Sequence, residues 1–168
     1  MEQVQTEDTI SPSDDNILEE PQSKPSTFVE RYFKTCVYQY QRKNPLNQDL
    51  LCEDVLVAQH SNLLYVTFLA DNHSAVQRHE IITQVNPVKW DSTNVHGKRK
   101  KGGRAVQPRT IICNIMTQSG TEYRVPAGVQ GSLVELNGRL QSEPSLLLDK
   151  RKTEGYIAVI LPKRNISK

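Results

Sequence analysis

The strongest signal for binding chemistry is a basic run between residues 98 and 104. Five cationic side chains fall within these seven positions: Lys98, Arg99, Lys100, Lys101 and Arg104. Like charges at this density repel one another and stay hydrated, and the glycines within the run favour a flexible loop. Three interpretations stay open: a nuclear import signal, an electrostatic patch for an acidic protein surface, and a merely solvated loop.

Nucleic acid is not an expected partner of this run. Binding of single strands needs aromatic side chains on which bases stack. Only Trp90 and Tyr123 lie near the run in sequence. The electrostatic attraction alone is therefore a weak argument for binding of RNA or DNA.

Side-chain catalysis is not expected, and neither is a resident metal or cofactor. No Gly-x-Ser-x-Gly, His-Glu-x-x-His or P-loop pattern occurs. Each histidine is interpreted as a solvated or turn residue: His60, His73, His79 and His96. Glu53 and Asp54 are the natural candidates for paired carboxylates, but adjacent residues of a strand point to opposite faces. We interpret them as the polar start of a strand, and residues 59–62 as a turn, with a binding loop as the alternative.

Composition predicts one intracellular domain with an acidic arm. The 168 residues, 36% of them hydrophobic, suffice for one modest core. Cys36, Cys52 and Cys113 lack metal-ligand spacing and are interpreted as reduced, buried thiols. The N-terminus lacks the features of a secretory signal, and no apolar run is long enough to span a membrane. We expect a protein of the cytosol or nucleus.

The charge is distributed unevenly along the chain. Residues 1–30 hold eight acidic residues and one lysine, whereas the remainder holds 20 basic and 11 acidic residues. Residues 1–26 contain few large apolar side chains and are predicted to be a disordered acidic arm. The arm is either a solubilising tail or a segment that competes for the basic surface of the domain. Residues 27–163 form the predicted domain, with a flexible basic loop at 94–109, and 164–168 form a tail.

Alternating apolar residues predict a β-rich domain of six to eight short strands. Phe28, Tyr32, Phe33 and Cys36 fall at helical spacing, so a short helix or turn begins the domain. Two β-branched and aromatic runs flank residues 59–62 as a first hairpin, and residues 81–90 favour a bent strand. A second hairpin turns at Ser119 and Gly120.

Residues 129–163 are interpreted as two short strands and a closing strand, punctuated by Gly131, Gly138, Pro144 and Gly155. The order Gly-x-Leu-x-Glu-Leu-Asn, Pro-x-Leu and Glu-Gly-Tyr resembles the glycine-cleavage H protein. That resemblance implies a barrel-sandwich hybrid of the lipoyl or biotinyl carrier type. The hairpin tip that would bear the carrier lysine reads Gln-Ser-Gly here, so a carrier role is disfavoured.

The stretches FVERYFKTCVYQY, CEDxxxxQHSN and TEGYIAVILPK resemble the Abitram family, also called Simiate, over roughly residues 28–163. The resemblance implies a non-enzymatic, actin-binding protein that modulates actin polymerisation. It also implies residence in nuclear speckles, cytoplasm and cell projections, and actin as the partner. The alternative function is a nuclear adaptor in transcription or RNA-processing assemblies, with other nuclear proteins as partners.

Overall fold

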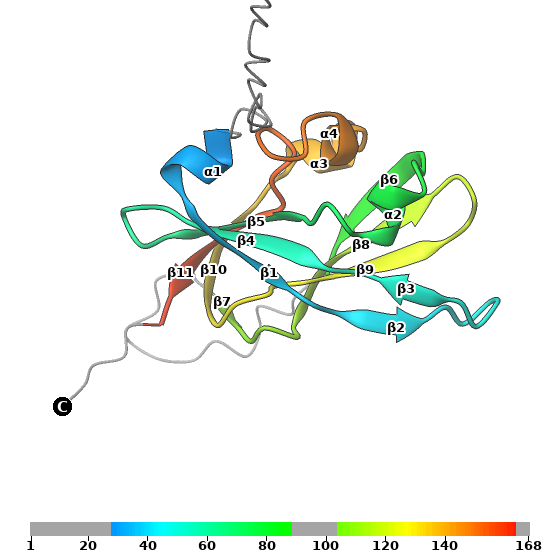
Figure 1. The fold of residues 1–168 in the computed structure, drawn as a ribbon, viewed down its shortest axis with the longest axis horizontal. Helices are drawn as coiled ribbons and strands as arrows, with labels where there is room; N and C mark the ends of the chain where they lie inside the picture. Colours follow the sequence, from blue (N-terminus) through cyan, green and yellow to red (C-terminus); the bar gives the residue numbers. More distant parts are fainter. Residues whose placement is uncertain (1–27, 89–103, 164–168) are drawn as a thin grey trace, which may run out of the picture.

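The computed structural model of the chain describes residues 28–88 and 104–163, and antiparallel strands dominate both stretches (Figure 1). The predicted arm and tail lie outside the described residues, as do positions 94–103 of the predicted basic loop. Within the described part of the chain, eleven strands occur instead of the expected six to eight, because several are only three residues long. The prediction of a mainly β fold is confirmed.

Six strands form the largest sheet. In spatial order they are β1 (Lys34–Tyr38), β4 (Val55–Gln59), β5 (Tyr65–Leu69), β11 (Ala158–Pro162), β10 (Gly131–Leu136) and β7 (Arg104–Val106). Every neighbouring pair is antiparallel. The β4–β5 pair is the first predicted hairpin, and it turns through residues 60–64.

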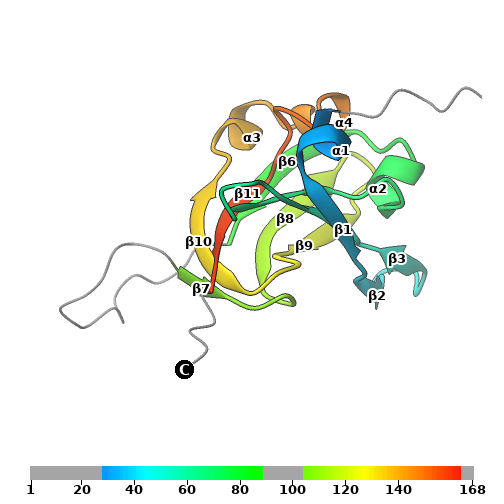
Figure 2. The same ribbon diagram turned by 60° about the vertical axis from the view of Figure 1, so that its left-hand side comes forward.

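A three-stranded sheet packs against this one. It contains β6 (Ile82–Pro87), β8 (Ile111–Thr117) and β9 (Glu122–Pro126) in the order β6-β8-β9. The β8–β9 pair confirms the second hairpin, and Gly120 at its turn has a φ of 81°, which glycine adopts without strain. In Figure 2 this sheet is seen between the strongly curved β10 on one side and β1 on the other.

A two-stranded ribbon, β2 (Gln41–Lys43) with β3 (Leu50–Cys52), extends the chain beyond β1. The main core lies between the two larger sheets, where buried residues from both meet, such as Val57, Ile160, Ile115 and Val125. The described strands form three separate hydrogen-bonded sheets and do not close into a single barrel. The finer expectation of a barrel-sandwich hybrid therefore stays a prediction.

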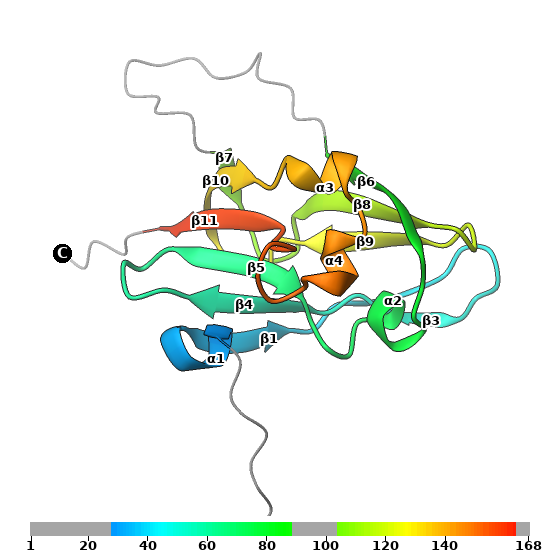
Figure 3. The same ribbon diagram turned by 90° about the horizontal axis from the view of Figure 1, so that it is seen from above.

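Four short helices complete the described part of the chain: α1 (Phe28–Tyr32), α2 (Ser74–Gln77), α3 (Arg139–Ser142) and α4 (Leu146–Asp149). Helix α1 is the short helix that the sequence predicts near this point. It ends at Tyr32, and Cys36 lies in β1 rather than on a helical face. Seen from above, α1 lies near the β1 edge of the six-stranded sheet and α3 lies near β10 (Figure 3).

Two expectations about the C-terminal third and the cysteines are wrong. Residues 139–149 form α3 and α4 between β10 and β11, so the region holds two strands with helices between them, not three strands. Leu140 and Leu147 of these helices are buried in the main core, which offsets the cost of ordering such short elements. All three cysteines were expected to be buried, but only Cys113 is. Cys36 is exposed and Cys52 is half-buried.

Candidate functional site: two hollows beside helix α1

The outer face of the six-stranded sheet carries an apolar groove next to α1. Successive residues of β5 alternate, so Val66 and Phe68 point outward while Leu69 joins the main core. Val29 of α1 packs on this outer face with Phe68 in a second, smaller cluster. The space left beside them has a volume of about 550 Å³. We call this space the α1 groove. The residues that line it are Val29, Phe33, Val66, Phe68, Asn137, Arg139, Lys152, Thr153, Glu154 and Tyr156.

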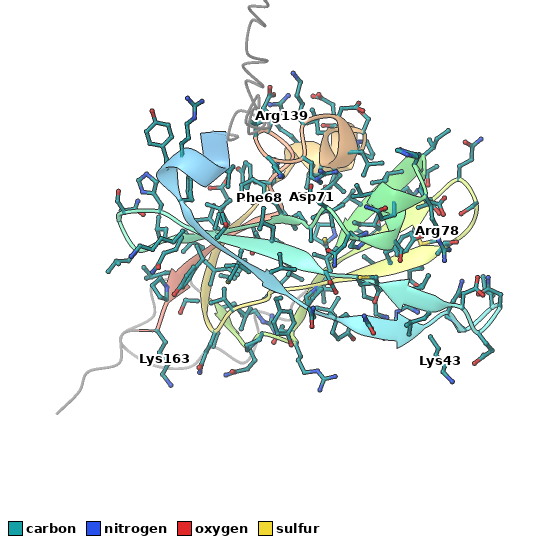
Figure 4. All side chains as sticks on the ribbon, in the orientation of Figure 1. Lys43, Phe68, Asp71, Arg78, Arg139 and Lys163 are labelled. Carbon is teal, nitrogen blue, oxygen red and sulfur yellow. The ribbon has the colours of Figure 1, made fainter. Side chains whose placement is uncertain are left out.

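Hydrogen bonds fix the wall of the α1 groove opposite α1. The side-chain amide of buried Asn137 donates to the carbonyl oxygens of Glu154 and Tyr156, at 2.8 and 2.9 Å. The Tyr156 hydroxyl donates to Glu135 at 2.9 Å, and Arg139 forms an ion pair with Glu154 at 2.7 Å. Figure 4 shows Phe68 and Arg139 on the same side of the sheet as α1. The groove thus has an apolar floor and a rim of ordered polar groups.

A second hollow lies on the other side of α1, with a volume of about 330 Å³. We call it the basic pocket, and its lining residues are Arg31, Tyr32, Phe33, Lys34, Gln59, His60, Ser61 and Leu63. Two of these side chains are cationic and none is a carboxylate. Phe33 lines both hollows, and its ring centroid lies 5.1 Å from that of His60.

The β4–β5 turn that forms one wall of the basic pocket is held by its own side chains. The backbone N–H of Asn62 donates to Nδ1 of His60 at 3.3 Å, and the side-chain oxygen of Asn62 accepts from the backbone N–H of Leu64 at 3.1 Å. Leu63 has a φ of 72°, a left-handed conformation that branched and bulky residues rarely adopt. Such a conformation persists where surrounding contacts fix it, and it often marks a functional turn.

The chain shares its sequence with a group of curated proteins. A Gallus gallus Protein Abitram is 38% identical over 122 residues, which cover 70% of this chain and 70% of the relative. The Homo sapiens protein is 37% identical over 149 residues, covering 84% and 78%, and the Dictyostelium discoideum protein is 33% identical over 138 residues, covering 81% and 75%. The chain belongs to the Abitram family. No protein-family model matches it.

Two of the stretches that carry the Abitram resemblance meet at the two hollows. Residues 59–62 end CEDxxxxQHSN and form the turn at the basic pocket, whereas Thr153, Glu154 and Tyr156 begin TEGYIAVILPK and line the α1 groove. A turn forms where it was predicted, but it runs through residues 60–64, because Gln59 is still paired in β4. The groove was not predicted from the sequence, although the outward alternation of Val66 and Phe68 was a signal for it.

The structure separates the predicted basic site from these hollows. Lys98, Arg99, Lys100 and Lys101 lie outside the described residues. Arg104 is exposed in β7, which occupies the opposite edge of the six-stranded sheet from β1. Arg104 is therefore not part of either hollow, and the role of the basic run stays a prediction.

Glu53 and Asp54 are not the polar start of a strand, contrary to the sequence-based interpretation. They lie between β3 and β4 and are 0% and 1% exposed. Glu53 pairs with Arg42 at 2.9 Å and accepts the backbone N–H of Arg124 at 2.8 Å. Burial raises the pKa of Glu53, and the bonds from Arg124 and Arg42 oppose that shift.

Asp54 and His73 complete this buried polar cluster of the Abitram chain. Asp54 accepts the backbone N–H of Tyr40 at 2.8 Å and the side-chain amide of Asn72 at 2.6 Å. His73, predicted to be a solvated or turn residue, is fully buried: its Nδ1 caps α2 by accepting the backbone N–H of Ala75 at 3.1 Å. Burial lowers the pKa of His73 to about 4, so the ring is neutral at physiological pH.

The carboxylates of this cluster hold together parts of the chain that are distant in sequence. The Arg42 guanidinium, which binds Glu53, also donates to the carbonyl oxygen of Glu122. Glu53 thus links the β2–β3 ribbon to β9. No group of three or more potential metal ligands occurs among residues 28–88 and 104–163. In the same stretches, no helix is long and apolar enough to cross a membrane.

Proposed function

We propose that the chain is a non-enzymatic actin-binding protein that modulates actin polymerisation, in the nucleus including its speckles and in the cytoplasm. Membership of the Abitram family supports this proposal together with the functional description that the sequence resemblance implies. The observation that carries it is the pair of hollows that meet at Phe33. They offer an apolar floor, aromatic side chains and a charged rim on one face.

This surface has the anatomy of a protein interface. Interface centres are apolar and enriched in aromatic residues and arginine, and a polar rim surrounds them. Here Phe33 and Tyr156 supply aromatic surface, and Arg139 and Glu154 supply the rim. Cationic groups at the basic pocket would accelerate association with an acidic surface, while the apolar floor would supply short-range specificity.

Two further features favour a binding function over catalysis and over a role as carrier of a prosthetic group. The oxygens of Glu53 and Asp54 already accept internal hydrogen bonds, so these carboxylates are committed to the fold. The β8–β9 turn contains no lysine that a prosthetic group could modify. We propose a barrel-sandwich hybrid that lacks the carrier site, and an intact mass without lipoyl or biotinyl adduct is the expected result.

The experiment is co-sedimentation of the full chain with purified actin filaments, together with a pyrene-actin polymerisation curve at two salt concentrations. Thr153→Glu places a carboxylate at the α1 groove, where it would repel an acidic surface, and should weaken pelleting at least tenfold. Thr83→Glu is the matched control, because Thr83 is likewise exposed, and each threonine hydroxyl donates to one backbone carbonyl. The control should pellet like the unmodified chain.

One outcome would overturn the proposal, and a second would exclude the α1 groove as the contact. If the unmodified chain neither pellets nor changes the polymerisation lag at low salt, the actin proposal fails and the nuclear adaptor is favoured. If it pellets but both threonine variants pellet equally well, actin binding stands and the α1 groove is not the contact.

A further inference from the structure

The basic pocket presents both positive charge and apolar surface to solvent, and the Arg31 guanidinium lies 6.0 Å from the centroid of the Tyr32 ring. Its charged lining residues are Arg31 and Lys34. At its mouth Tyr32 is 61% exposed and Leu63 is 58% exposed, although both are large and apolar. Such a surface fits an acidic peptide that carries an apolar anchor.

We propose that the basic pocket binds residues 14–20 of the same chain, Asp-Asp-Asn-Ile-Leu-Glu-Glu. This segment has four carboxylates and two adjacent apolar residues within seven positions. The carboxylates are complementary to Arg31 and Lys34, and Ile17 and Leu18 supply the apolar anchor for the surface of Tyr32 and Leu63. The segment is an internal competitor for any acidic partner of this pocket.

The short stretch of chain between residue 20 and α1 acts as a tether, and it favours residues 14–20 over a free peptide as the occupant. Glu20 is eight residues before Phe28, the first residue of α1, and Arg31 lines the pocket one turn further on. Eight residues reach at most about 26–29 Å when fully extended, which exceeds the length of α1 several times. A short tether gives an effective concentration in the millimolar range, so even a millimolar intrinsic affinity fills the pocket about half of the time.

Electrostatics makes the contact sensitive to salt. Exposed opposite charges attract over a Debye length of about 10 Å at 0.1 M salt and about 3 Å at 1 M salt. The segment should therefore occupy the pocket at low ionic strength and leave it at high ionic strength. The apolar contact of Leu18 is much less affected by screening, so the anchor and the charges can be tested separately.

The test is hydrogen exchange of the full chain, without actin, read at the backbone amides of residues 59–64. Leu18→Ser removes the apolar anchor without changing the charge, and exchange should become about twofold faster at 20 mM salt, as half occupancy of the pocket allows. Lys34→Glu should have the same effect. The matched control is Lys43→Glu, which makes the same charge change at an exposed strand lysine far from α1, as Figure 4 shows.

Zero-length carbodiimide cross-linking identifies the occupant. Monomers at 20 mM salt should contain cross-links between Lys34 and carboxylates of residues 14–20, and 500 mM salt should abolish them. Equal exchange in the unmodified chain, Leu18→Ser and Lys34→Glu overturns the inference. Cross-links found only between two molecules also overturn it and identify a second copy as the occupant. Either result leaves the actin experiment unaffected, because no actin is present.

Discussion

Removing Arg42 should destabilise the chain far more than removing the charge of its partner Glu53. Glu53 is fully buried, whereas the Arg42 side chain is 16% exposed. Arg42→Met leaves a buried carboxylate whose remaining protein partner is the backbone N–H of Arg124. Breaking a buried pair in this way costs about 3–5 kcal/mol. Glu53→Gln keeps an acceptor for that N–H, and the Arg42 head group can still reach water, so a loss of about 1–2 kcal/mol is expected.

The pH dependence of this loss has a definite sign. Burial already raises the pKa of Glu53 above its ordinary 4.5. In Arg42→Met the pKa of Glu53 rises further, because the guanidinium that stabilises the carboxylate is gone. A raised carboxyl pKa means that the folded state binds a proton that the unfolded state releases. Stability is therefore retained below about 4.5 and lost as the pH rises through the folded pKa.

The assay is urea unfolding of both single variants and the double variant at pH 5 and pH 8. Arg42→Met should lose more stability at pH 8 than at pH 5. The double variant should be more stable than Arg42→Met alone at pH 8, because it buries no charge, and this non-additivity measures the coupling. A loss below about 1 kcal/mol for Arg42→Met, or an equal loss at both pH values, would refute the reasoning.

Three further predictions test the buried groups. Burial lowers the pKa of His73 from 6.5 to about 4. The contribution of the neutral ring to the free energy of unfolding is therefore fully present above pH 6.5 and falls by on the order of 3 kcal/mol towards pH 4. In urea unfolding at a series of pH values, His73→Asn should reduce this pH dependence. In Gly155→Ala, a Cβ would lie 2.1 Å from a carbonyl oxygen of α4, and thermal unfolding should show a loss of several kcal/mol. Gly138→Ala, with open space around its Cβ, should change stability by less than about 1 kcal/mol. Burial raises the pKa of the Cys113 thiol to about 12. Iodoacetamide at pH 8 should therefore alkylate exposed Cys36 and leave Cys113 unmodified. Equal labelling of both cysteines in the folded chain would contradict the burial of Cys113.

Local alternation was sufficient to predict much of the fold. Val66 and Phe68 alternate with inward residues along β5, and the turn at Gly120 separates two alternating runs, so both hairpins were readable from the sequence. The helices α3 and α4 were not, because each is a single turn and Pro144 lies between them. Elements this short have little intrinsic stability and form because Leu140 and Leu147 enter a core assembled by distant strands.

The buried polar cluster was inaccessible to sequence reasoning for a related reason. Glu53 and Asp54 were assumed to alternate as in a strand, but they lie between β3 and β4, where no such constraint holds. Both side chains turn inward toward donors that are remote in sequence, and the Arg124 N–H is 71 positions from Glu53. His73 is likewise buried by elements that precede and follow it at long range, among them Tyr123, whose ring centroid is 5.2 Å away.

The candidate site follows from a mismatch between the sheet and its covering helix. Strands β4 and β5 are apolar on both faces, because Ala58 and Phe68 join the outer cluster while Val57 and Leu69 enter the main core. A sheet with apolar residues on both faces needs other elements packed against each face. Helix α1 has five residues and is therefore about 7.5 Å long, whereas the three strands β4, β5 and β11 together span about 10 Å across their axes. The helix covers part of that face, and the uncovered remainder is the α1 groove.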